Sequence, residues 1–217
     1  MHYISTISKL EIEGGCLTLS ATTRRHYGHA TEVVVIDQQL GYIPIPKNGS
    51  TSIRQMLTLA GVPHTSIYDT ANDPVKFFKQ FDNIKLFTVI RRDSEQRLLS
   101  GINEYLTRTH QLFNDSMLLN LPLDEHSAYQ ASYLIGVDLT TVDILTLYNV
   151  EQYINNYLGI KLIMPRQNKS AANDIESLRQ RIANLPNFTN YLEGEKSTVD
   201  SIIGFKLKPK PVTLGHQ

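Results

Sequence analysis

The sequence predicts an α/β fold of three layers, in which a central parallel sheet lies between two layers of helices. Residues 84–90 (IKLFTVI) form a nearly continuous apolar run, as is typical of a strand buried on both faces. Segments with helical spacing follow the expected strands, and this alternation favours a parallel sheet. The expected strands are 33–36, 41–46, 65–68, 84–90 and 161–164, and the expected helices are 50–59, 74–81, 93–106, 128–135, 149–158 and 174–183.

Local signals justify these elements in order. The β-branched run 33–36 (VVVI) favours a strand, and prolines close the next one at 44 and 46. Ile53 and Leu57 lie at helical spacing, and Gly61 and Pro63 end that helix. Asp73 before a proline indicates the start of the helix at 74–81. Residues 93–106 repeat the helical pattern, and the second half of the chain is mostly helical.

Length and composition indicate one domain, residues 1–217, with a lead-in at 1–30 and a surface tail at 205–217. The 21 Lys and Arg balance 21 Asp and Glu, which argues against nucleic-acid binding by bulk charge. The single cysteine, Cys16, excludes an intramolecular disulfide and a multi-cysteine zinc site. No apolar run approaches the roughly 20 residues of a membrane span, so we expect a soluble, cytoplasmic protein. Its oligomeric state is not predicted.

The segment 46–52 (PKNGSTS) stands between a strand end and a helix start. Such a junction turns free backbone N–H groups and the positive end of a helix dipole toward an anion. Gly49 permits close approach and Lys47 adds a positive charge, which predicts a P-loop-like phosphate site. It is not a Walker A loop, because Pro46 stands where that motif needs glycine. The alternative is that Ser50 only caps the helix and Lys47 is a solvated side chain.

A second candidate anion site, residues 89–100 (VIRRDSEQRLLS), follows the buried strand. Arginine at the carboxyl end of a central strand faces the crevice where α/β sheets bind ligands, and its planar fork suits a phosphate. Ser100 lies eight residues after Arg92, about two helical turns on. The alternative is helix capping with surface ion pairs. Two anion sites at strand-to-helix junctions of one sheet favour the binding interpretation.

These motifs resemble a known family. PKNGSTS resembles the 5′-phosphosulfate loop of sulfotransferases that use 3′-phosphoadenosine 5′-phosphosulfate (PAPS), and VIRRDSEQRLLSGINEYL resembles their 3′-phosphate motif. Ser94 departs from the proline of that motif. Residues 124–130 (DEHSAYQ) and 165–170 (PRQNKS) are similar to segments of the carbohydrate branch, the Golgi-type family 2 enzymes. The resemblance covers about residues 41–170.

The resemblance implies a role for each matching residue. Lys47 would act at the sulfuryl group and its bridging oxygen, and His126 is the first candidate for the base that deprotonates the acceptor. His64 and Glu95 are the reserve candidates. The implied catalytic residues are Lys47 and His126, and the implied cofactor-binding residues are Lys47, Asn48, Gly49, Ser50, Thr51, Ser52, Arg92, Ser100, Asn168 and Ser170.

The expected function is therefore an enzyme that transfers a sulfuryl group from PAPS to a hydroxyl of a carbohydrate or related small acceptor, by in-line displacement and with no metal. The first alternative is a nucleotide kinase, for which Asp138 and Asp143 are weak candidates to bind magnesium. The second is a non-catalytic nucleotide-binding module that kept the phosphate loops. Which acceptor is used is not predicted.

Overall fold

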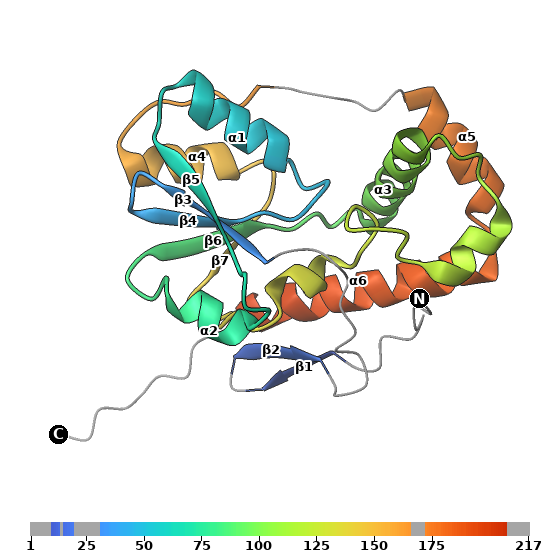
Figure 1. The fold of residues 1–217 in the computed structure, drawn as a ribbon, viewed down its shortest axis with the longest axis horizontal. Helices are drawn as coiled ribbons and strands as arrows, with labels where there is room; N and C mark the ends of the chain where they lie inside the picture. Colours follow the sequence, from blue (N-terminus) through green and yellow to red (C-terminus); the bar gives the residue numbers. More distant parts are fainter. Residues whose placement is uncertain (1–9, 14, 20–30, 166–171, 208–217) are drawn as a thin grey trace.

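The computed structural model describes residues 10–13, 15–19, 31–165 and 172–207 (Figure 1). None of the helices within these ranges is long and apolar enough to cross a membrane. In chain order the elements are β1 (Leu10–Glu13), β2 (Cys16–Leu19), β3 (Glu32–Ile36), β4 (Leu40–Ile43), α1 (Ser50–Leu59), β5 (His64–Tyr68), α2 (Pro74–Lys79), β6 (Lys85–Val89), α3 (Ser94–Thr109), the 3₁₀ helices η1 (Asp115–Asn120) and η2 (Gln130–Leu134), β7 (Asp143–Leu145), α4 (Val150–Leu158), α5 (Ala172–Ile182) and α6 (Pro186–Leu207).

The main sheet has five strands in the order β5-β3-β4-β6-β7. β4, β6 and β7 are parallel, with Tyr42 opposite Phe87 and Thr88 opposite Ile144. β1 and β2 form a separate antiparallel hairpin. Because β4 and β6 are parallel neighbours, the loops that follow them leave the sheet at the same end of the strands. The two sequence motifs therefore lie side by side, at the carboxyl ends of adjacent strands.

The mixed α/β class is confirmed, but the expectation of an all-parallel sheet is wrong. β3 runs antiparallel to both β4 and β5. The reason is a tight turn after β3, in which Asp37 and Gln38 both have positive φ and the Gln39 N–H donates to the Ile36 carbonyl at 3.0 Å. That turn makes β3 and β4 a hairpin. No glycine marks the turn in the sequence.

Helices cover both faces of the sheet (Figure 1). Alternate residues of β3 point to opposite faces, as strand geometry requires. Val34 packs with α1 and α4, whereas Val33 packs with α2, η2 and α6. A third apolar cluster joins α3, α5 and α6 beyond the end of the sheet. The motif loops lie between the sheet and this helical part.

The structure confirms several of the helices and strands that the sequence predicted. α1 has the expected bounds, and Asp73 caps α2 by accepting a hydrogen bond from the Lys76 N–H at 3.1 Å. The expected helices at 93–106, 149–158 and 174–183 correspond to α3, α4 and α5, and the expected strands at 65–68 and 84–90 to β5 and β6. The helix expected at 128–135 is the shorter 3₁₀ helix η2. β7 was not expected, because its three residues are too few for a clear pattern.

The prediction of a strand at 161–164 is wrong. The backbone there bonds to side chains of α4 instead of to a strand. The Leu162 N–H donates to Asn155 Oδ1 at 2.7 Å, and the Met164 N–H donates to Glu151 Oε2 at 2.7 Å. The long helix α6 was also not expected, and it continues to Leu207, three residues into the segment 205–217 that was expected to be a tail.

Candidate functional site

The first loop ends in a helix terminus that has no side-chain cap. Gly49, not Ser50, is the N-cap of α1, and Ser50 is the first helical residue. No side chain in the described part of the chain caps these first amides, and the first turn has no acidic residue. The alternative in which Ser50 only caps the helix is therefore wrong. These backbone N–H groups remain available to an anion.

Gly49 is required by the shape of the loop. Its φ is 85°, a left-handed conformation that favours glycine, and an added Cβ would collide with the side chain of Leu147. Lys47 also has a positive φ, of 67°. The two unusual backbone conformations turn the chain sharply from β4 into α1. The result is a strand–turn–helix junction at the position that the sequence predicted.

The side chain of Asn48 holds this loop to the sheet. It is fully buried, and its Nδ2 donates to the Val89 carbonyl and to Gln130 Oε1, each at 2.6 Å. Its Oδ1 is buried without a hydrogen-bond partner in the described structure. The side-chain amide of Asn48 therefore serves the fold, and its backbone N–H is also used within the loop, where it donates to the Ile45 carbonyl at 3.2 Å.

The second motif is tied to the first through Arg91 and Gln130. The Arg91 N–H donates to Gln130 Oε1 at 2.8 Å, and its carbonyl accepts from Gln130 Nε2 at 2.9 Å. An Arg91 guanidinium N–H also donates to the Lys47 carbonyl at 3.3 Å. Burial lowers the pKa of Arg91. Arg92, the residue that the resemblance assigns to a 3′-phosphate, is exposed beside it.

A buried ionic network anchors Gln130 from behind. Glu195 of α6, 1% exposed, accepts from Gln130 Nε2 at 2.9 Å, and Arg97 of α3 donates to Glu195 at 3.4 Å. Burial raises the pKa of Glu195 against the opposing effect of Arg97. Sequence reasoning missed this network. Glu195 lies on the stripe of α6 that also holds Leu192 and Val199, so the spacing would have revealed it once that helix was expected.

Lys47 and His126 meet at one carboxylate, that of Glu104 in α3. The Lys47 ammonium contacts Glu104 Oε2, and His126 Nε2 lies 3.2 Å from Glu104 Oε1. The structure thus brings together the two residues assigned as catalytic, 79 positions apart. Sequence reasoning missed Glu104, for which the one signal was its position one turn after Ser100, a half-buried residue of the same helix.

The turn that carries His126 packs directly on α3. An alanine Cβ at Gly101 would lie 2.6 Å from the His126 carbonyl carbon and 3.0 Å from the Ser127 nitrogen, so only glycine permits this approach. Glu104 and Arg108 lie three and seven residues further, on the same helical face. Arg108 donates to Asp124 at 2.6 Å. This face of α3 therefore fixes where the imidazole stands.

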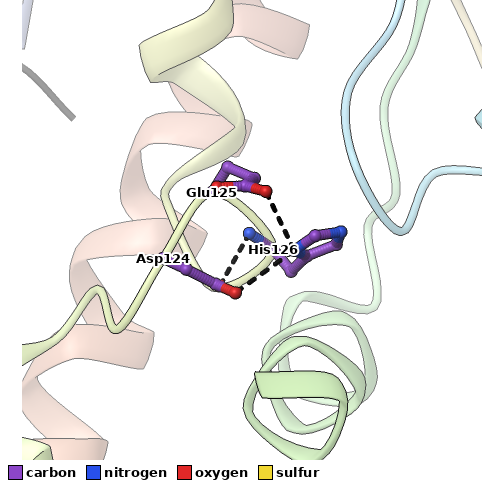
Figure 2. Close-up of side chains that lie close together, drawn as sticks. All are labelled: Asp124, Glu125 and His126. Atoms are coloured by element: carbon purple, nitrogen blue, oxygen red, sulfur yellow. Dashed lines mark hydrogen bonds and ion pairs between the residues drawn. The ribbon is translucent and has the colours of Figure 1, made fainter. Parts of the chain in front are cut away.

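Carboxylates surround the imidazole of His126 (Figure 2). Its Nδ1 lies 3.3 Å from Asp124 Oδ2 and 3.6 Å from Glu125 Oε1, and Glu104 faces the other ring nitrogen. The hydrogen bond to Asp124 raises the pKa of His126, with a further contribution from Glu104. Burial acts to raise the pKa of Asp124, but the contacts with His126 and neighbouring amides lower it overall. These contacts favour the protonated imidazole over the neutral form.

Asp124, Glu125 and His126 also form the one group within the described ranges whose ligand atoms could hold a metal ion. Asp124 already accepts from Arg108 and from the backbone N–H of His126, at 2.6 and 2.9 Å. The guanidinium beside this carboxylate opposes a second cation there. The arrangement suits a proton-handling histidine better than a metal centre.

The remaining candidate residues take several positions, some at the N-terminus of α1 and others away from it. His64 begins β5, which runs in the same direction as β4, so it lies at the opposite edge of the sheet from the motif loops. Glu95 accepts from Arg179 of α5 at 2.9 Å. Thr51 is exposed in the first turn of α1 and Ser52 is half-buried there. Asn168 and Ser170 lie outside the described residues.

No family model, curated protein or solved structure gives a significant match to this chain. The resemblance to sulfotransferases therefore rests on the sequence motifs alone.

Proposed function

We propose that this protein is a sulfotransferase that transfers a sulfuryl group from PAPS to a hydroxyl of a carbohydrate or related small acceptor. The observation that carries the proposal is the meeting of Lys47 and His126 on the two sides of one carboxylate. In-line transfer of an oxyanion needs a cation at the leaving oxygen and a base at the attacking hydroxyl. These two side chains, assigned from separate motifs, are bridged by one carboxylate group.

The donor site fits the charge of PAPS. The uncapped N-terminus of α1 and Lys47 supply donors for a 5′-phosphosulfate, and the first turn holds no carboxylate to oppose it. Exposed Arg92 is available to a 3′-phosphate. When bound, PAPS would supply the sulfuryl group and its bridging oxygen as the leaving group.

The chain's own residues would act in three ways. The α1 amides bind and orient the anion, Lys47 stabilises the negative charge that develops on the leaving oxygen, and Nε2 of His126 accepts the acceptor's proton. Asp124 keeps the imidazole oriented through Nδ1. Since His126 must be neutral to act as a base, the rate should fall as the pH drops through its raised pKa.

A calorimetric titration tests the donor site. We expect 3′-phosphoadenosine 5′-phosphate to bind more tightly than AMP in the presence of a chelator. Arg92→Ala should weaken the 3′-phosphorylated nucleotide about 10- to 100-fold while AMP is unaffected, the size expected for a hydrogen bond to a charged group. Lys76→Ala, at an exposed position on α2, is the control and should change neither affinity. Equal affinity for the two nucleotides would refute the proposal.

One observation favours a second candidate, a non-catalytic nucleotide-binding module. Glu104 pairs with Lys47, and the carboxylates around His126 raise its pKa, which disfavours the neutral imidazole that a catalytic base needs. Lys47→Ala separates the candidates when turnover is measured with PAPS and a panel of sugar acceptors. A catalyst loses turnover far more than nucleotide affinity, whereas a binding module loses affinity alone.

The kinase alternative is weakened by the positions of its candidate acids. Asp143 begins β7, at the edge of the sheet away from the motif loops, where it pairs with Lys85 at 3.0 Å. Asp138 is exposed and accepts from Thr140 at 2.8 Å. ATP binding that requires magnesium would nevertheless favour a kinase over a sulfotransferase.

A further inference from the structure

Glu104 places its two oxygens on two different positive groups. Oε2 contacts the Lys47 ammonium, and Oε1 lies 3.2 Å from His126 Nε2. A carboxylate and a sulfuryl group both present oxygens from one central atom at similar spacing. The carboxylate therefore fills the place that an oxyanion between Lys47 and His126 would need.

From this geometry we infer that Glu104 is an internal substitute for the ligand oxyanion, which replaces it between Lys47 and His126. The inference rests on the proposed function only in taking that oxyanion to be the transferred sulfuryl group. Glu104 is then a positioning residue. In the resting site it holds Lys47 and His126 at the separation that the ligand needs, and it yields this position when the ligand binds.

The environment of Glu104 is suited to such an exchange. Its side chain is 38% exposed, whereas Lys47 and His126 are 19% and 21% exposed. The carboxylate can therefore swing into solvent while the two cations stay half-buried. Ion pairs at this exposure are weak, and a doubly or more highly charged oxyanion that also reaches the α1 amides would compete successfully.

The charges around His126 determine how replacing Glu104 by an oxyanion changes the pKa of the imidazole. Glu104 of α3 faces Nε2, Asp124 and Glu125 of its own turn face Nδ1, and Lys47 approaches from the loop before α1. Removing the charge of Glu104 lowers the pKa of His126, because one of the anions that favour the imidazolium is lost. An anion bound in its place restores that effect.

The test uses inorganic sulfate as the probe and the His126 ring signals in NMR as the readout. Glu104→Gln removes the competing charge at constant shape, so we expect sulfate to bind about two- to fivefold more tightly than to the wild type. The His126 pKa without sulfate should fall. Glu176→Gln is the control, since Glu176 lies on α5, is 51% exposed and pairs with Arg179. It should change neither quantity.

Glu104→Asp is the second variant, because it keeps the charge but is one methylene too short to reach both cations. It should also bind sulfate more tightly than the wild type. Unchanged or weaker sulfate binding in both variants, or an unchanged His126 pKa in Glu104→Gln, overturns the inference. A preference for 3′-phosphoadenosine 5′-phosphate over AMP tests the proposed function separately. Tighter sulfate binding without that preference would support the inference that an oxyanion displaces Glu104, and it would refute the proposed sulfotransferase function.

Discussion

Replacing Gly101 by alanine tests how α3 positions His126. In an open helix this change stabilises by about 0.5–1 kcal/mol, because alanine has the higher helix propensity. Here the new Cβ would lie 2.6 Å from the His126 carbonyl carbon and 3.0 Å from the Ser127 nitrogen, both of which are backbone atoms. Overpacking of this kind costs about 1–3 kcal/mol, and backbone neighbours cannot move as a flexible side chain can. We therefore expect a net loss of about 1–2 kcal/mol in the free energy of unfolding.

The assay is urea unfolding combined with an NMR titration of the His126 ring. The clash should push the turn away from α3, so that Glu104 no longer reaches Nε2 and the His126 pKa falls toward its ordinary value of 6.5. Gly204→Ala is the control, since it lies within α6 and an added Cβ there meets nothing within 4 Å. That variant should be as stable as the wild type or more so. If Gly101→Ala matched it and kept the His126 pKa, the argument that glycine sets the position of His126 would be refuted.

Two further predictions concern pH and the buried amide. The raised pKa of His126 means that its contacts stabilise the fold fully below about pH 6.5 and that this contribution is lost as the pH rises through the folded pKa. His126→Gln should therefore lose more stability at pH 5.5 than at pH 8.5 in urea unfolding, and an equal loss would contradict this sign. Asn48→Asp would set a carboxylate against the Val89 carbonyl and Gln130 Oε1. It should cost about 1–3 kcal/mol or more, measured by thermal unfolding, whereas Asn103→Asp on α3 is the milder comparison because its side chain is only half-buried.

The elements that the sequence predicted have signals within a few residues of each other. α1 follows a glycine and ends before Gly61 and Pro63, and α3 is capped by Asp93, which accepts from the Gln96 N–H at 3.0 Å. Propensity, capping and breakers all act locally, so one window of sequence contains the information. The two anion motifs belong to this class, and their place at one edge followed from the parallel pairing of their strands.

The elements that the sequence did not predict depend on partners far along the chain. The buried stripe of α6 includes Glu195 and Thr198, polar residues whose burial is compensated by Gln130, Arg97 and the helix backbone. The apolar members of the stripe indicate a buried face, but the partners that make the burial of Glu195 possible lie far along the chain. The direction of β3 depends on a turn in which Asp37 and Gln38 both have positive φ, a conformation that is uncommon outside glycine. In both cases the tertiary structure overrides the local preference.

Gln130 explains why the two motifs form one site and not two neighbouring loops. A primary amide can accept two hydrogen bonds and donate two. Gln130 accepts from Asn48 and from the Arg91 N–H, and it donates to the Arg91 carbonyl and to Glu195. All four bonds are made in a fully buried position, where an unmade bond would be costly. Neither loop can shift alone without breaking one of them, so Arg91 and its exposed neighbour Arg92 are held in place relative to the N-terminus of α1. Gln130 thus supplies the preorganisation that the proposed sulfuryl transfer would require.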